Sequence, residues 1–217
     1  MIWAAVPSAA PETTPADGFG TVTGAITLAL ISRPLSVADY VSRHVRQPTT
    51  DRWPEIRNVL VYVDGFPPPA VLPAGRANIR QVDESFEPRV LAVTRGSTVE
   101  FPNDDPFFHN VFSLSRAASF DLGRYRRGVS RGYTLDQAGI VKIFCDLHSH
   151  MSAVVIVLDH PYFATPDDDG RFVLDNVPPG KFNIAAWHER VGSSTQTIVI
   201  EPRSTSHVEF SLPVLDP

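Results

Sequence analysis

Residues 144–151 read FCDLHSHM, and this stretch decides how the whole chain is interpreted. It places Cys145, His148 and Met151 at intervals of three, directly after an apolar segment, Ile140–Cys145, that has the character of a strand. A thiolate, an imidazole and a thioether therefore share one short loop. A loop fixed between two hydrogen-bonded strands holds such side chains rigidly, so the stretch is a candidate metal site.

A fourth candidate ligand lies upstream. Residues 101–112 read FPNDDPFFHNVF, in which a strand ends, a loop turns and His109 opens the next strand. Two imidazoles, a soft thiolate and a weak axial thioether suit copper that cycles between Cu(I) and Cu(II). Zinc rarely uses a thioether, and structural zinc sites prefer more than one thiolate. We therefore expect one copper ion bound by His109, Cys145, His148 and Met151.

Other copper arrangements and enzyme activity find little support. Cys145 is the only cysteine, whereas a dinuclear electron-transfer centre needs two, and no disulfide can form within the chain. Catalytic copper needs further histidine clusters, but the histidines outside the motif stand singly. His150 leaves open an alternative ligand or a second, weak site. We find no Ser-His-Asp spacing, phosphate loop or carboxylate pair, and expect no enzyme.

Length and composition indicate one or two globular domains built from strands. The chain has 217 residues, 43% of them hydrophobic, with 20 prolines and 13 glycines spread along it. The net charge of -5 argues against binding to nucleic acid. Four arginines around Tyr125, between Arg124 and Arg131, form either a solvated loop or a docking patch for an acidic partner. No apolar run is long enough for a membrane span.

The pattern of alternating residues and turn signals predicts an all-β fold. Residues 1–18 are expected to be a disordered tail or the remnant of a secretion signal, and Leu35–Arg46 a short helix. Gly24 marks a bend or a close backbone approach. The expected strands are Thr21–Leu28, Asn58–Val63, Ala77–Val82, Arg89–Val93, Ser97–Phe101, His109–Ser113, Ile140–Cys145, Ala153–Leu158, Arg171–Leu174, Lys181–Ala186, Thr197–Ile200 and His207–Leu212.

The motif Cys145-x2-His148-x2-Met151, with the earlier His109-Asn110-Val111, resembles the copper loop of cupredoxins such as amicyanin and plastocyanin. The resemblance covers residues 76–158 and implies a Greek-key β-sandwich with a mononuclear type 1 (blue) copper site. It implies that Cys145 gives the short in-plane bond and Met151 the axial one. Asn110 is expected to tie the two ligand loops together.

The flanking segments carry a second resemblance. Asp169-Gly170-Arg171-Phe172, followed by Asn176-Val177-Pro178-Pro179-Gly180-Lys181-Phe182, is similar to the signature of carboxypeptidase-regulatory-like, transthyretin-type sandwiches. This resemblance implies that residues 19–75 and 159–217 form a second small β-sandwich, into which the copper domain is inserted or to which it is fused. The motif indicates a fold and says little of function.

Together these features predict a one-electron carrier in the cell envelope, periplasmic or secreted, that exchanges electrons with redox partner proteins. An apolar ring for docking is expected from Phe107, Phe108, Met151 and Ala153. The alternatives are a non-redox envelope binding module and a copper-storage or delivery protein with a cupredoxin fold. A delivery site would favour more than the two methionines present.

Overall fold

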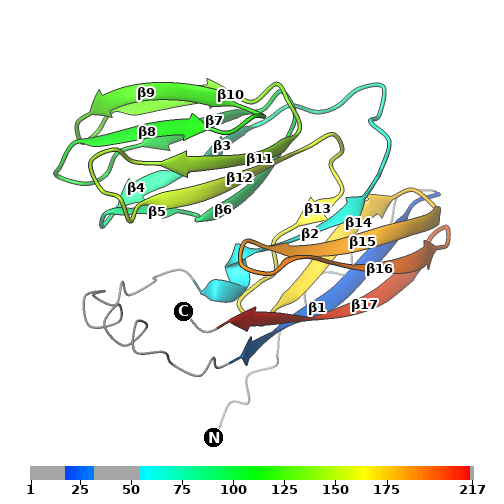
Figure 1. Cartoon of the computed structure of the whole chain (residues 1–217). Coiled ribbons are helices and arrows are strands. Elements are labelled where there is room, and N and C mark those ends of the chain that lie inside the picture. The colour runs from blue at the N-terminus through cyan, green and yellow to red at the C-terminus, as the bar shows by residue number, and fades with distance from the viewer. Residues whose placement is uncertain (1–17, 32–53, 216–217) are drawn as a thin grey trace, which may run out of the picture.

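The computed structural model describes residues 18–31 and 54–215 (Figure 1). Within these ranges it contains seventeen strands and one 3-10 helix, so the predicted all-β fold class is confirmed. The strands form two β-sandwiches, one inserted into the other. The expected helix at 35–46 and all but the last residue of the expected tail lie outside the described residues. No helix in the described ranges is long and apolar enough to cross a membrane.

The inserted sandwich is formed by consecutive strands in the middle of the chain. A five-stranded sheet, β6-β12-β11-β8-β9, faces a three-stranded sheet, β10-β7-β3, and the hairpin β4–β5 closes one end. The strands are β3 (Arg76–Asn78), β4 (Arg80–Val82), β5 (Ser85–Glu87), β6 (Val90–Thr94), β7 (Thr98–Pro102), β8 (His109–Leu114), β9 (Ser119–Tyr125), β10 (Ser130–Thr134), β11 (Gly139–Phe144) and β12 (Ser152–Leu158).

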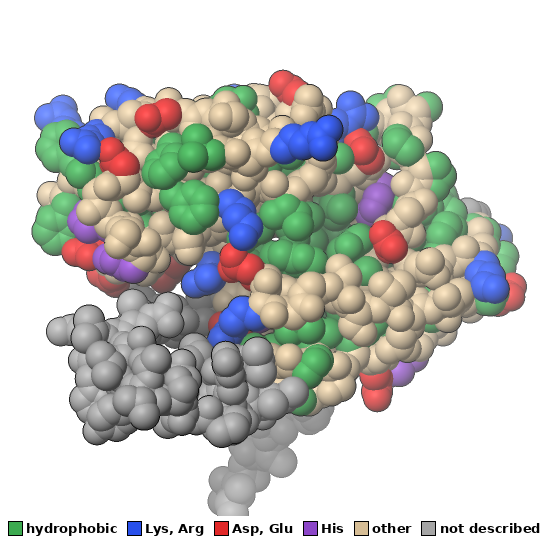
Figure 2. All heavy atoms as spheres, viewed as in Figure 1, with side chains coloured by type: hydrophobic (Ala, Val, Ile, Leu, Met, Phe, Trp, Pro, Cys, Tyr) green, Lys and Arg blue, Asp and Glu red, His purple; other side chains and the backbone are tan. Residues whose placement is uncertain are grey.

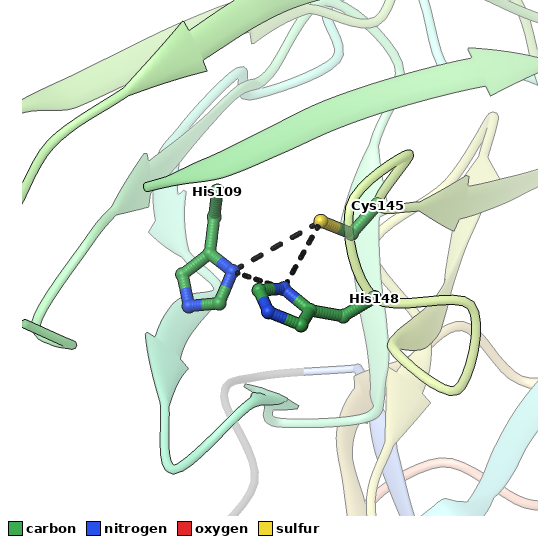
Figure 3. Close-up of side chains that lie close together, drawn as sticks. All are labelled: His109, Cys145 and His148. Carbon is green, nitrogen blue, oxygen red and sulfur yellow. Dashed lines mark hydrogen bonds between the residues drawn. The ribbon is translucent and has the colours of Figure 1, made fainter. Parts of the chain in front are cut away.

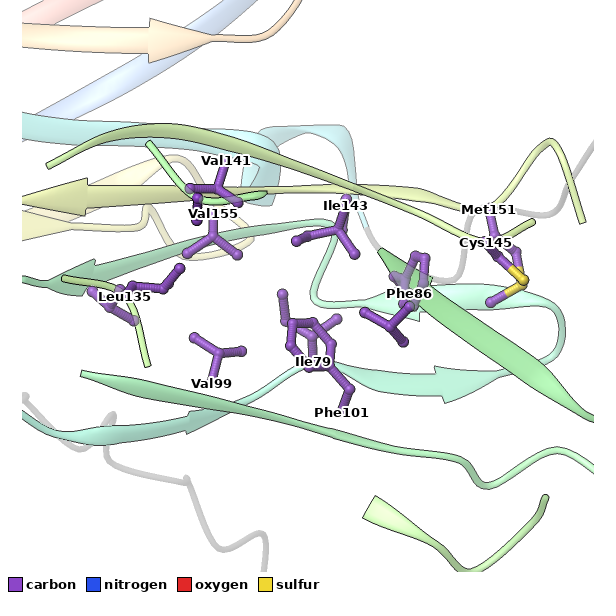
Figure 4. Packing of buried hydrophobic residues seen from close by; sticks show 14 of the residues in the cluster. Ile79, Phe86, Val99, Phe101, Leu135, Val141, Ile143, Cys145, Met151 and Val155 are labelled. Atoms are coloured by element: carbon purple, nitrogen blue, oxygen red, sulfur yellow. The ribbon is translucent and has the colours of Figure 1, made fainter. Parts of the chain in front are cut away.

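The core of the inserted sandwich follows from the alternation of its strands. In β11, Val141 and Ile143 are buried, while Ile140 and Lys142, which alternate with them, are exposed, as a strand with one buried face requires. The inward side chains of both sheets meet in one cluster that runs to Cys145 and Met151 at its end (Figure 4). Cys145 and Met151 of the candidate metal-binding loop are therefore part of the packed core.

The outer sandwich combines strands from both ends of the described chain. One sheet has the order β14-β1-β17 and the other β13-β2-β15-β16. The elements are β1 (Gly20–Ile31), the 3-10 helix η1 (Glu55–Asn58), β2 (Val59–Asp64), β13 (Phe163–Ala164), β14 (Arg171–Val177), β15 (Gly180–His188), β16 (Gly192–Ile200) and β17 (Thr205–Leu215). Its likeness to carboxypeptidase-regulatory sandwiches stays a prediction.

The first and last strands of this sandwich run parallel to each other along their length. Gly24 of β1 shows why a glycine is needed there, since a Cβ at this position would lie 1.9 Å from the Val208 carbonyl oxygen and 2.5 Å from the Phe172 ring. The predicted close backbone approach is thus present.

The structure corrects several strand predictions. The single strand expected at Ala77–Val82 is wrong, because β3 ends at Asn78 and the chain continues past Ile79 into the hairpin β4–β5. Ile79 itself is fully buried, and its N–H donates to the carbonyl of Glu100. Strands β9 and β10 were not predicted, since β10 has four exposed residues out of five and little apolar alternation.

The two sandwiches are joined by a small apolar cluster. Strand β12 is buried on both faces, because Val155 points into the inserted sandwich while Val154 and Ile156 pack with Trp187 of the outer sandwich. An ion pair of 3.0 Å between Arg89 and Glu189 adds to this contact. Beside the cluster is an apolar hollow of about 240 Å³, where hydrophobic side chains gather between the sandwiches (Figure 2).

Candidate metal centre

Three predicted ligands lie together at one end of the inserted sandwich. His109 is the first residue of β8, Cys145 directly follows β11, and His148 lies in the loop that leads to β12. Strand β11 is paired with both β8 and β12, and Phe144 is the residue that contacts each of them in register. This pairing brings the loops together, so that residues 36 or more positions apart in sequence share one site.

The ligand atoms form a compact triangle (Figure 3). The Nδ1 atoms of His109 and His148 lie 3.0 Å apart, and the Cys145 Sγ lies 3.9 Å and 3.8 Å from them, respectively. A point roughly 2.0 Å from each nitrogen and roughly 2.3 Å from the sulfur, the usual metal bond lengths for such donors, lies almost in the plane of the three atoms. The donor set and its spacing therefore fit one metal ion.

Burial separates this site from water on most sides. The His109 side chain is fully buried and Cys145 is 4% exposed, whereas His148 is partly exposed. A buried thiol beside two imidazole nitrogens has no disulfide partner, since Cys145 is a free cysteine. The arrangement is that of a metal site with one imidazole directed toward the surface.

Met151 lies at the same end of the core. It is 2% exposed, belongs to the same buried cluster as Cys145, and is drawn beside it in Figure 4. Its backbone N–H donates to the carbonyl of His148 over 3.0 Å, which closes the ligand loop just before β12. The placement is compatible with an axial thioether, and coordination by Met151 stays a prediction.

The structure adds a residue that the sequence did not single out. The Nε2 atom of His109 lies 2.8 Å from Oδ2 of Asp105, and both side chains are buried. Burial raises the pKa of this carboxyl, but hydrogen bonds from the Glu84 N–H, from His109 and from the Asp83 N–H outweigh it, so the pKa lies below its ordinary value. Nothing in the motif distinguishes Asp105 from its neighbour Asp104, because the difference arises only in the folded loop.

Asn103 fixes the loop that carries Asp105. Its side-chain amide donates to the carbonyls of Phe107 and Tyr125, at 2.9 Å and 3.0 Å, and its oxygen accepts from the N–H of Asp105. Asn103 is fully buried. One buried amide thus binds three backbone groups, two in the loop between β7 and β8 and one at the end of β9.

Asn110 is also buried, and its side-chain amide is directed at β9. Its amide donates to Asp121 on β9 over 2.7 Å, at the irregularity in the β8–β9 register. Within the described residues its Oδ1 atom has no hydrogen-bond partner. The structure therefore shows Asn110 joining β8 to β9, and its expected role in tying the two ligand loops together stays a prediction.

The surface around the site is part apolar and part charged. Phe107, Phe108 and Leu147 are 50%, 57% and 39% exposed. The predicted docking ring is wrong for Met151 and Ala153. Both side chains are buried in the core of the inserted sandwich and present no surface to a partner.

Charged side chains complete the rim. Arg124, in the arginine cluster, forms an ion pair of 2.7 Å with Asp146 of the ligand loop. His150 is about half exposed and lies 3.4 Å from Glu84. It is not part of the three-residue cluster, so the predicted alternative of a ligand role for His150 gains no support from its position.

These features define a two-sandwich β protein with a buried His-Cys-His site. No family model matches the chain, and no curated protein matches it. Solved structures similar to the chain include cupredoxins. A purple cupredoxin from Nitrosopumilus maritimus is 22% identical over 38% of this chain and 99% of its own, with a TM-score of 0.35. A reduced amicyanin variant is 21% identical over 45% of this chain and 98% of its own, with a TM-score of 0.37.

A copper-containing nitrite reductase from Thermus scotoductus SA-01 is 22% identical over 59% of this chain and 28% of its own, with a TM-score of 0.36. Each of the three likenesses covers only part of this chain.

Proposed function

We propose that this protein is a mononuclear type 1 copper protein that carries single electrons in the cell envelope. The observation that carries the proposal is the triangle of His109, Cys145 and His148, with sides of 3.0, 3.8 and 3.9 Å and only the His148 imidazole partly exposed. When bound, copper supplies one-electron exchange between Cu(I) and Cu(II). One thiolate and two imidazoles held in fixed positions would serve both states, so the protein would not need to rearrange when an electron arrives.

The chain's own residues keep the site fixed and dry. Cys145 is held at the end of β11, and the ligand loop is closed by the hydrogen bond from Met151 to His148. His109 is held at the start of β8 with its ring fully buried. Ligands held by strands and short loops keep their positions better than ligands on long loops. This rigidity favours electron transfer over metal release.

The route for electrons is expected to be the exposed edge of His148. This imidazole is the only one of the three ligands that is not buried. Phe107, Phe108 and Leu147 present apolar surface from the two adjoining loops. A small apolar contact with a charged rim suits the brief, weak docking of redox partners. The proposed partners of this protein are other redox proteins.

A copper-storage or delivery role is the second candidate. A fully buried His109 argues against it, because exchange of metal between proteins needs ligands that are open to the partner. The chain also has only two methionines, one of them at position 1. A binding module without metal is the third candidate, and it leaves the juxtaposition of Cys145 with two imidazole nitrogens without a purpose.

Voltammetry of the copper-loaded protein tests the proposal. We expect one reversible one-electron wave, fast electron self-exchange, and loss of the wave in Cys145→Ser. A protein that binds Cu(I) tightly but shows no reversible wave would instead be a storage or delivery protein. A protein that binds no copper would be a binding module.

A further inference from the structure

We propose that Asp105 is a positioning residue for His109, and that its buried charge lowers the reduction potential of the metal centre. This inference rests on the proposed function. It concerns a residue outside the ligand motif, and it derives from the hydrogen bonds made by the two ends of one imidazole ring.

Each ring nitrogen of His109 faces a different group. The Nδ1 atom faces Cys145 and His148, while Nε2 lies 2.8 Å from Oδ2 of Asp105. A carboxylate accepts hydrogen bonds, so the ring proton must be on Nε2. The lone pair on Nδ1 is then free for the metal. Asp105 thus selects the tautomer and fixes the ring plane, as carboxylates commonly do for metal-bound histidines.

The Asp105 carboxylate is itself held in place. Oδ1 accepts from the Asp83 N–H at 2.7 Å, and Oδ2 accepts from the Glu84 N–H at 2.9 Å as well as from His109. Asp83 and Glu84 have positive φ angles of 50° and 53°, a turn conformation that directs both N–H groups at the carboxylate. The turn of the hairpin β4–β5 therefore binds the Asp105 carboxylate through two backbone N–H groups.

A fixed buried charge has an electrostatic consequence. The oxidised metal carries one more positive charge than the reduced metal, and a nearby carboxylate stabilises the oxidised form more. The side chain of Asp105 is 5% exposed, so solvent screens it little. Among the described residues no carboxylate bonds to His148. The two imidazoles are unequal, with only His109 coupled to a negative charge.

Asp105→Asn, compared with Asp104→Asn, separates this role from a general effect of the loop. Asparagine with its oxygen at the Oδ2 position keeps the bonds from His109 and Glu84 but loses the charge and the bond that Oδ1 accepts from the Asp83 N–H. Asp104 is the adjacent carboxylate, partly exposed and paired with Arg80 at 2.7 Å, so its replacement should leave the centre unchanged.

For Asp105→Asn we expect Cu(II) affinity to fall roughly 10- to 100-fold and Cu(I) affinity to fall less. Each tenfold difference between the two losses raises the midpoint potential by about 59 mV. An unchanged potential in a folded Asp105→Asn protein whose wild type shows the copper–thiolate band would overturn the inference. Absence of that band in the wild type would overturn the proposed function instead.

A measurement on the unmodified protein covers the case in which the variant does not fold. In the Cu(I)-loaded wild type, ¹⁵N NMR should show His109 with its proton on Nε2 and exchanging slowly with water. The Nε2 proton of His148 should exchange fast. Equal exchange rates for the two rings, or a metal-free His109 that carries no proton on Nε2, would overturn the proposed positioning.

Discussion

The Nδ1 atoms of His109 and His148 lie 3.0 Å apart, yet the two rings face different surroundings. His109 is fully buried and bonded to Asp105, whereas His148 is partly exposed on the ligand loop. Two lone pairs at that distance repel each other, so the pair needs either a shared proton or a metal ion between them. The difference in exposure leads to a prediction for each ring.

Removing the His148 ring should leave a gap that small ligands enter from solvent. We expect the copper–thiolate absorption to be altered in His148→Gly and restored by added imidazole. His109→Gly should show no such recovery, because its gap is sealed and Asp105 is left without its partner. Titration with imidazole, followed by visible absorption, makes the comparison. Equal recovery in both variants would show that the two rings are equally accessible.

Trp187 should contribute to stability through the contact between the sandwiches. It is 9% exposed and packs with Val154 and Ile156 of β12. We expect Trp187→Ala to lower the free energy of unfolding by about 3 kcal/mol, as is usual for a buried aromatic side chain. Denaturant unfolding measures this loss of free energy of unfolding. Val199→Ala is the control, because Val199 is 55% exposed. Equal stability of the two variants would contradict a packed interface.

Gly24→Ala should disrupt the outer sandwich. The added Cβ would meet the Val208 carbonyl oxygen at 1.9 Å, and backbone in the middle of a paired strand cannot move aside easily. Overpacking of this kind typically costs 1–3 kcal/mol, and we expect about 3 kcal/mol here. Thr27→Ala, at an exposed position of the same strand, is the control. Thermal unfolding that is the same for both variants would show that β1 and β17 are less closely paired.

Stability should fall in acid through Glu55. The hydrogen bond from His188 lowers its pKa, burial opposes this, and Arg190 lowers it further, from 4.5 to about 2. A carboxyl whose pKa is lower in the folded state stabilises the fold above the unfolded value of 4.5. This contribution is lost as the pH falls from 4.5 toward 2.

Glu55→Gln should therefore destabilise the protein at pH 6 and have little effect near the folded pKa of about 2. Urea unfolding over this pH range measures the effect, with the exposed Glu201→Gln as the control. A constant difference between Glu55→Gln and wild type at every pH would contradict the role assigned to this carboxyl.

Sequence spacing predicted that Cys145 and His148 lie together because covalent neighbours on a short loop stay together in any strand–loop–strand structure. Cys145 and His148 needed only that loop, and His109 needed only the expectation that its strand pairs with β11. Strand predictions succeeded where one face is apolar, as in β11, or where both faces are apolar, as in β12. They failed for β10, whose residues are mostly exposed and whose pairing with β7 comes from the backbone.

Two features lay beyond sequence reasoning for a physical reason. The bond between Asp105 and His109 depends on backbone N–H groups supplied by a hairpin about twenty residues earlier. The burial of Met151 depends on how the ligand loop closes before β12, and that of Ala153 on which face of β12 its side chain takes. Both are set by tertiary packing, which the local pattern of residues does not contain.

The central claim is that Cys145 binds copper together with His109 and His148. The most direct test is the visible absorption and EPR spectrum of the protein loaded with Cu(II), recorded beside Cys145→Ser. We predict an intense thiolate-to-copper charge-transfer band and narrow copper hyperfine splitting in the wild type, both lost in the variant. A colourless wild-type protein, with copper bound as an ordinary tetragonal ion or not bound at all, would contradict the account.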